Sequence, residues 1–182
     1  MKLTTKRLIL REITAKDIPD LIRNINNVKI SRYLLGVNYP YTMKDARLGL
    51  NECKRKAKEK PRATYTFCIE LKSKKGIIGE VELNHVDNFQ GTANIDYWLG
   101  EDYWRQGIVS EAVTEVLAFA FKKLKLRRIN LYAFAENKGS SAIAKKFGFK
   151  FEGRTRKEVR DNATGRIHDA NYYGLLKEDW KK

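Results

Sequence analysis

The stretch that decides the fold, residues 93–113, reads ANIDYWLGEDYWRQGIVSEAV. Residues 93–99 predict a strand, and apolar residues at helical spacing follow from Gly107 to Leu124. A strand that turns sharply into a helix leaves several backbone amides without partners, and the helix dipole adds positive potential there. Gly107 would let a ligand approach the backbone, and Arg105 would add a fixed positive charge. The junction therefore predicts a site for an anion such as a phosphate.

Outward from this junction, the patterns predict strands at 7–12, 64–71, 77–86, 128–135, 149–159 and 169–176. Further helices are expected from Asp17, with Pro19 in the first turn, from Thr42 through Ala57, and at 140–147. Residues 64–71 alternate apolar and polar, which is typical of a strand buried on one face. The three strands between 64 and 99 predict an antiparallel meander. The whole order predicts a mixed α/β fold around one core.

Length and composition favour a globular protein. The chain has 182 residues, of which 42% are hydrophobic and 32% charged, and this predicts a single domain over 1–182. It has no apolar run of about 18 residues, so no membrane-spanning helix is expected. The N-terminal residues do not resemble a signal peptide, and Cys53 and Cys68 suit neither a disulfide framework nor a metal site. We therefore expect a cytoplasmic protein without a metal.

The net charge of +15 comes from two stretches of the chain. Residues 44–75 hold 11 basic and 4 acidic side chains, and residues 122–160 hold 13 basic and 3 acidic ones. Such a surface favours polyanionic partners, among them RNA, a phosphorylated cofactor or an acidic protein face. No aromatic-interleaved RNA-binding motif accompanies the charge. A solvated, lysine-rich surface is therefore the simpler interpretation, and both stay open.

Several segments resemble one known family when they are taken together with the 93–113 junction. They are TKRLILR at 5–11, NKGSS at 137–141, KFGF at 146–149 and YYGLL at 172–176. In this order and at this spacing, the sequence is similar to the GCN5-related N-acetyltransferases (GNAT). The similarity is greatest to the branch that contains the ribosomal-protein N-terminal acetyltransferases. It spans nearly the whole chain.

This resemblance implies a mostly antiparallel sheet flanked by helices, with a splayed strand pair that binds acetyl-CoA. The strand residues Tyr97, Trp98 and Leu99 would offer backbone groups to the pantetheine arm. The residues expected to hold the pyrophosphate are Arg105, Gln106, Gly107, Ile108, Val109 and Ser110. Asn137 and Ser140 would line the cofactor near its thioester. Outside the family pattern, Asn137 could equally cap a helix, and Tyr97 and Trp98 could be core aromatics.

The catalytic residues follow the family pattern less closely. Many relatives place a tyrosine that acts as general acid where this chain has Ala144, so Ser140 or water is expected to protonate the leaving thiolate. Relatives often carry a glutamate at the position of Asn94. The acids that remain on neighbouring strands are Glu80, Glu82 and Asp96, and a partly buried carboxylate among them would serve as general base. His85 and His168 are expected to be structural.

The resemblance implies transfer of an acetyl group from acetyl-CoA to a primary amine by direct attack. A peptide α-amine with a pKa of ~8 is about 10% neutral at pH 7, so a weak base suffices for it. A protein N-terminus is therefore the expected acceptor, the resemblance implies a ribosomal protein as a candidate, and the basic surface could contact the ribosome. The alternatives are a small amine such as a polyamine or an aminoglycoside, and a catalytically silent module that binds acetyl-CoA or the ribosome. A monomer and a homodimer are both compatible with the sequence.

Overall fold

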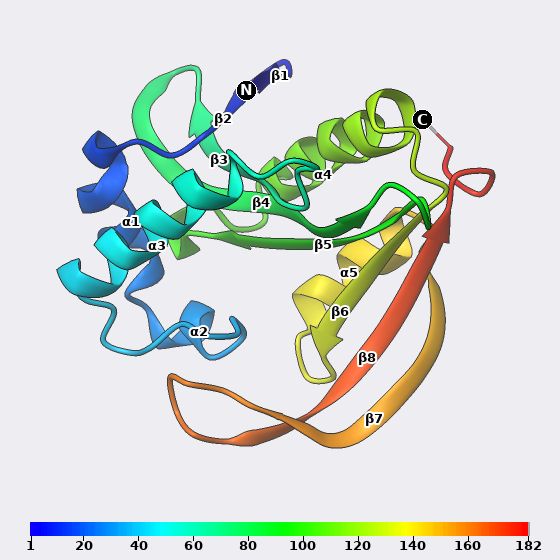
Figure 1. Cartoon of the computed structure of the whole chain (residues 1–182). Coiled ribbons are helices and arrows are strands. Elements are labelled where there is room, and N and C mark those ends of the chain that lie inside the picture. Colours follow the sequence, from blue (N-terminus) through cyan, green and yellow to red (C-terminus); the bar gives the residue numbers. More distant parts are fainter. Residues whose placement is uncertain (182) are drawn as a thin grey trace.

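The computed structural model describes residues 1–181, and these form an eight-stranded sheet with helices on both faces (Figure 1). The strands are β1 (Lys2–Thr4), β2 (Leu8–Arg11), β3 (Tyr65–Leu71), β4 (Lys74–Asp87), β5 (Thr92–Leu99), β6 (Arg128–Phe134), β7 (Lys150–Arg160) and β8 (Ile167–Leu176). The α-helices are α1 (Ile18–Ile25), α2 (Val28–Ser31), α3 (Met43–Lys56), α4 (Ile108–Ala118) and α5 (Lys138–Lys146). The strand order is β1-β2-β3-β4-β5-β6-β8-β7. The predicted mixed α/β fold with an antiparallel β3–β4–β5 meander is confirmed.

Two apolar clusters lie on opposite faces of the sheet. The larger one joins the sheet to α4 and α5, and the smaller one joins it to α1 and α3. Because both faces are covered, β3 is buried on both sides: Thr66 and Cys68 on one face are buried, and so are Phe67 and Ile69 on the other. The expectation of a strand buried on one face was therefore wrong. The alternation at 64–71 reflects side-chain size and polarity, and Thr66 compensates its burial by a hydrogen bond to Glu82.

The pair β5–β6 positions the site. These strands run parallel and pair only over Thr92–Asn94 and Arg128–Asn130, whereas all other neighbouring strands are antiparallel. Beyond Asn94 and Asn130 the strands diverge, which confirms the splayed pair expected from the resemblance. The opening lies beside the start of α4 and the start of α5 (Figure 1).

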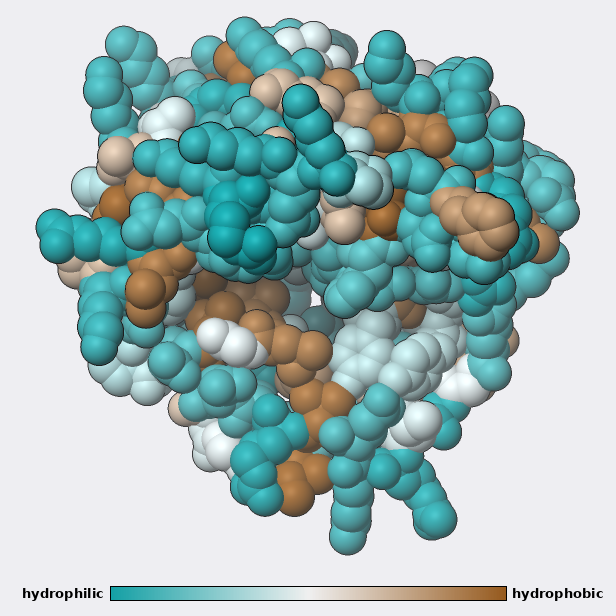
Figure 2. Space-filling model, in the orientation of Figure 1, coloured by the Kyte–Doolittle hydropathy of each residue, from teal (hydrophilic) through white to brown (hydrophobic). Residues whose placement is uncertain are grey.

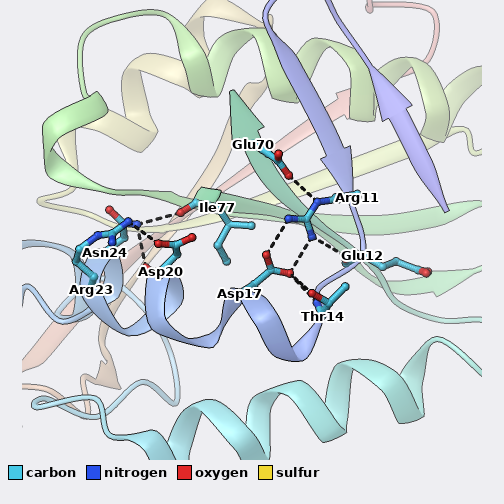
Figure 3. Close-up of polar contacts among 9 residues, drawn as sticks. All are labelled: Arg11, Glu12, Thr14, Asp17, Asp20, Arg23, Asn24, Glu70 and Ile77. Carbon is cyan, nitrogen blue, oxygen red and sulfur yellow. Dashed lines mark hydrogen bonds and ion pairs between the residues drawn. The ribbon is translucent and has the colours of Figure 1, made fainter. Parts of the chain in front are cut away.

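Arg11 anchors helix α1 to the sheet (Figure 3). Its guanidinium donates to both carboxylate oxygens of Asp17 at 2.7 and 2.8 Å, and to Glu70 of β3 at 2.7 Å. Asp17 also accepts from the backbone N–H and the hydroxyl of Thr14, which closes the capping box before α1. Asn24, near the other end of α1, donates to the carbonyl of Ile77 in β4. The helix is therefore fixed at both ends over the face that carries the smaller cluster.

Most predicted elements are present with shifted boundaries. The helix from Thr42 is confirmed with Thr42 as its cap, and α1 begins directly after Asp17. The helix expected over 107–124 is α-helical only to Ala118 and continues as a π-helical segment, Phe119–Lys123. The short elements β1 and α2, of three and four residues, were not predicted from the sequence. Within residues 1–181, no helix has the length and apolar character needed to cross a membrane.

Candidate active site

A cavity of about 870 Å³ runs from the β5–α4 turn, past the β5–β6 opening, to the helices α1, α2 and α3. Figure 2 shows this face of the molecule hollowed, with apolar side chains inside the opening and hydrophilic ones around it. The cavity has two kinds of wall. One is the backbone turn and strand edges near α4 and α5, and the other is apolar side chains with a group of carboxylates. The two walls suit two different ligands.

The turn before α4 has the geometry of an anion cradle. Arg105 and Gly107 both have positive φ, +61° and +73°, so the chain reverses sharply before the helix begins at Ile108. The first-turn amides of α4 have no intrahelical partners, and they share their position with the positive end of the helix dipole. A Cβ on Gly107 would have ordinary contact only, 3.6 Å from Arg7 Nη2. The left-handed backbone at Gly107 is therefore the local reason for glycine at this position.

The predicted cradle residues differ in how they face the cavity. Arg105, Gly107, Ile108, Val109 and Ser110 all line it. The side chain of Ile108 is only 2% exposed and belongs to the core, so its backbone is the part available to a ligand. Gln106 is not among the lining residues, and its amide donates to the carbonyl of Asp102 instead. The structure thus gives Gln106 a role in shaping the turn.

The N-terminal segment braces this turn, which the sequence analysis missed. Arg7 donates to Glu111 on α4 at 2.6 Å and to the carbonyl of Gln106 at 3.0 Å. Thr5 donates to the same Glu111 carboxylate at 2.5 Å. Burial alone would raise the pKa of Glu111, but these hydrogen bonds and the charge of Arg7 hold it below its usual value. Contacts between residues about 100 positions apart leave no local signal in the sequence.

Three carboxylates gather at the floor of the cavity, and all three are sequence-predicted site residues. In the β4–β5 register Glu82 faces Asp96, and Glu80 faces Trp98, so the side chains share one face of the sheet. Thr66 donates to Glu82 at 2.5 Å, and Asn84 donates to Asp96. Cys53 and Tyr41 line the cavity beside Glu80. The arrangement concentrates negative charge inside a molecule whose overall charge is strongly positive.

This crowding changes the acidity of the group. Burial raises the pKa of Glu80 to about 8, and repulsion from Glu82 and Asp96 adds to the effect, while Lys56 opposes it. Burial also raises the pKa of Asp96, although Asn84 stabilises its charged form and its side chain still reaches solvent. A carboxyl group that exchanges its proton near pH 8 is suited to accept a proton from an amine. Glu80 is the best placed of the three in this respect.

The residues expected near the thioester also lie together. Asn137 caps α5 by accepting a hydrogen bond from the Ser140 amide at 3.1 Å, and both residues line the cavity. Ala144 is fully buried and offers no hydroxyl, as expected. The hydroxyl of Tyr97 is buried without a hydrogen-bond partner among residues 1–181. Burial raises the pKa of Tyr97, and the nearby Ser140 side chain opposes that rise. The resemblance implies a backbone role for Tyr97, and no local pattern predicts that its hydroxyl is buried without a partner.

The two histidines lie outside this group. His168 is 4% exposed, stacks on Phe134 and sits between Glu136 and Asp161, with both ring nitrogens 2.7 Å from a carboxylate oxygen. It joins β8 to the β6–α5 turn and the β7–β8 turn, which is a structural role. His85 lies in a β-bulge with φ of +48° and contacts Asn84 and Asn94. The bulge interrupts the alternation of side chains along β4. His85 therefore contacts Asn84 and Asn94, which strict alternation would place on the opposite face of the sheet.

Comparison with known proteins agrees with this geometry. Residues 7–150 match the family model described as the acetyltransferase (GNAT) domain. The chain is 29% identical over 175 residues to the uncharacterized N-acetyltransferase YoaA of Bacillus subtilis, covering 96% of each chain. It is 32% identical over 77 residues to the ribosomal-protein-serine acetyltransferase of Escherichia coli, covering 42% of this chain and 43% of that protein.

Among solved structures, it resembles RimL, a ribosomal L7/L12 alpha-N-protein acetyltransferase in complex with coenzyme A. The TM-score is 0.83 at 20% identity, and the match covers 97% of this chain and 98% of that one. This similarity shows that the two chains share a fold. The family match covers most of the chain and includes the cradle, the carboxylates and Ser140. The chain belongs to the GNAT acetyltransferases and is an acetyl-CoA-dependent N-acetyltransferase.

Proposed function

We propose that this enzyme acetylates the N-terminal α-amine of a protein, and that residues 1–182 form one catalytic domain. The observation that carries the proposal is the carboxylate group Glu80, Glu82 and Asp96 at the floor of the cavity, with the pKa of Glu80 raised to about 8. An α-amine has an ordinary pKa of ~8, against ~10.4 for a lysine side chain. A base with a pKa near that of the amine can remove its proton at neutral pH.

In this proposal the cofactor lies along the other wall of the cavity. The amides of residues 105–110 hold the pyrophosphate, helped by the charge of Arg105. The backbone of Tyr97, Trp98 and Leu99 faces the pantetheine arm in the β5–β6 opening, and Asn137 and Ser140 border the thioester. Acetyl-CoA supplies an activated acyl group, and its thiol is the leaving group. The left-handed Gly107 and the open strand edge support this placement.

The reaction needs two proton transfers from residues that the cavity brings together. Glu80 takes a proton from the acceptor ammonium, directly or through water, and the neutral nitrogen forms its bond to the acetyl carbon. The carbon–sulfur bond then breaks and Ser140 protonates the departing thiolate, while the nitrogen gives up its second proton through water to restore the serine hydroxyl and become the amide. Glu82 and Asp96 stabilise the positively charged acceptor before the transfer. The nearness of Ser140 to the Tyr97 hydroxyl adds a second O–H group that supports this assignment.

Two kinds of relative support a protein acceptor. The Escherichia coli relative is named for a ribosomal-protein serine, and the RimL structure for an alpha-N-protein acetyltransferase. The three carboxylates also favour a second candidate, a small polycationic amine such as a polyamine or an aminoglycoside. A silent module that only binds acetyl-CoA or the ribosome would not need a carboxyl group with a raised pKa beside the opening.

A thiol-release assay with acetyl-CoA separates these candidates. Peptides with a free α-amine, N-blocked twins of the same peptides, spermidine and an aminoglycoside are compared at equal concentration. We expect release with the free peptides and little with the blocked twins. Release with the polyamine alone would replace the proposed acceptor. If none of the amines causes release although coenzyme A still binds, the silent module would be favoured.

A further inference from the structure

The cavity continues past the carboxylates into an apolar pocket between the sheet, α1, α3 and the loop after α2. Six of its lining residues, named here as the side-chain pocket, are Ile25, Leu34, Val37, Tyr41, Gly49 and Trp98. Trp98 and Ile25 belong to the smaller apolar cluster, and Leu34, Val37 and Tyr41 pack against it. Figure 2 shows apolar surface inside the opening on this face of the molecule. The mechanism above uses none of the pocket's apolar side chains.

Gly49 makes room in this pocket. It lies in the middle of α3, where glycine is less favourable than alanine, on the same side of the helix as the buried Ala46 and Leu50. A Cβ at this position would lie 3.3 Å from the hydroxyl of Tyr41, a tight contact that this side chain would have to relieve. The glycine therefore lets Tyr41 lie across the helix at the wall of the pocket. A larger residue at position 49 would occupy space in or beside it.

The carboxylates and the apolar wall are adjacent. Glu80 is the register partner of Trp98, and its charge acts on both Tyr41 and Cys53, whose pKa values are raised to about 12, mainly by burial. A ligand that places its ammonium group at Glu80 would thus have the carbon next to that nitrogen at the mouth of the side-chain pocket. In a peptide, that carbon bears the first side chain. Charge complementarity would hold the amine at Glu80, and the apolar wall of the pocket would then contact the first side chain.

Resting on the proposed function, we infer that the side-chain pocket receives the first residue of the acceptor polypeptide, and that this residue is large and apolar, such as leucine or methionine. A small or charged first residue would leave the pocket empty or bury a charge in it. Filling an apolar pocket with a leucine-sized side chain is worth about tenfold or more in catalytic efficiency. The pocket is thus the structural source of acceptor specificity.

The test is a peptide series that differs only in its first residue: glycine, alanine, leucine, methionine or aspartate. For the wild-type enzyme we expect kcat/KM for the leucine and methionine peptides to exceed that for the glycine peptide about tenfold or more, with the aspartate peptide lowest. Gly49→Leu should reduce the leucine-to-glycine ratio about tenfold. Arg47→Leu adds the same side chain at an exposed position of α3 and should leave the ratio unchanged.

The outcomes distinguish this inference from the proposed function. Acetylation of all peptides with equal efficiency, or a preference for glycine or alanine, overturns the side-chain pocket while α-amine transfer stands. Acetylation of hexylamine but of no peptide overturns the peptide acceptor, and with it the assignment of the pocket to a first residue. If Gly49→Leu does not fold, the wild-type series still decides, because it needs no variant.

Discussion

At the scale of single residues, Glu80 links the environment of the cavity to its chemistry. Its carboxyl group must be ionised to accept a proton, and its pKa is raised to about 8, so kcat/KM should increase with pH up to about 8 and then level off. Glu80→Gln should lower kcat/KM by about 100-fold and remove this dependence. Steady-state rates between pH 6 and 9.5 check both effects. An unchanged profile in the variant would assign the ionisation to the acceptor amine or to Asp96.

The same residue predicts a pH-dependent change in stability. Because the folded-state pKa of Glu80 lies above its unfolded value of 4.5, ionisation costs stability, and the cost grows from pH about 4.5 to about 8 and is constant above. Glu80→Gln avoids this cost, so its gain in melting temperature over wild type should be larger at pH 8 than at pH 5. An equal difference at both pH values would mean that Glu80 is not buried enough to matter.

Ser140 gives a separate prediction on the leaving group. Ser140→Ala should lower kcat about tenfold or more, which is the lower end of the range for general acid catalysis. Ser141→Ala is the matched control, since Ser141 accepts a hydrogen bond from Tyr173 and is not among the residues that line the cavity. Wild-type turnover in Ser140→Ala would leave protonation to water or to Tyr97, and Tyr97→Phe would then separate those two.

At the scale of elements, the turn between β5 and α4 should decide cofactor affinity. Gly107→Glu fills the cradle with a carboxylate, repels the pyrophosphate and strains a left-handed backbone, so coenzyme A binding should be lost in calorimetry. Gly165→Glu is the control, because Gly165 has the same φ of +73° and nothing within 4 Å of the added Cβ. If Gly107→Glu and the wild type bind coenzyme A with equal affinity, the pyrophosphate site does not lie at this turn.

The attachment of α1 to the sheet predicts a pH effect of opposite sign. Burial alone would raise the pKa of Asp17, but hydrogen bonds from Arg11 and Thr14 hold it below its usual value. The carboxylate therefore stabilises the fold at neutral pH, and this contribution is lost as the pH falls below about 4. Asp17→Asn should cost about 2 kcal/mol at pH 7 and much less near pH 3, as measured by urea unfolding. A constant cost would contradict an ionic role for Asp17.

At the scale of the whole molecule, the positive surface and the carboxylate-lined cavity are separate features. Lys123 and Lys125 are exposed at the end of the helical stretch that starts at the cradle, and sixteen residues at ~1.5 Å each put Lys123 about 24 Å from Gly107. If this surface contacts a ribosome, reversing both charges should weaken ribosome binding most at low salt. Acetylation of a short peptide should stay unchanged. If the affinity for ribosomes does not change, these lysines form a solvated surface that does not contact the ribosome.

The fold could be read from the sequence largely because its signals are local. Helix caps such as Thr42, the strand-to-helix junction at Gly107 and the alternation in β4 and β5 all act within a few residues. The prediction that β3 is buried on one face only was wrong, because α1 and α3 pack on its second face and no local pattern encodes that packing. The short β1 and α2 carry too few residues for a periodic signal.

The candidate site was predictable in its members but not in its arrangement. Glu80, Glu82 and Asp96 could be placed on one face by parity, but the raised pKa of Glu80 depends on burial that no pattern encodes. The brace from Arg7 to Glu111 and the unpartnered Tyr97 hydroxyl depend on contacts between distant segments. The bulge at His85 defeats simple alternation. Chemistry-bearing residues were visible in the sequence, whereas their electrostatic coupling required the structure.

We propose that the carboxylate-floored cavity transfers an acetyl group to an α-amine. The most direct measurement is mass spectrometry of a peptide that has a free N-terminus and one internal lysine, incubated with enzyme and acetyl-CoA beside its N-blocked twin. We predict one acetyl group on the α-amine of the free peptide and none on the blocked twin. Acetylation of the lysine, or equal modification of both peptides, would contradict the account.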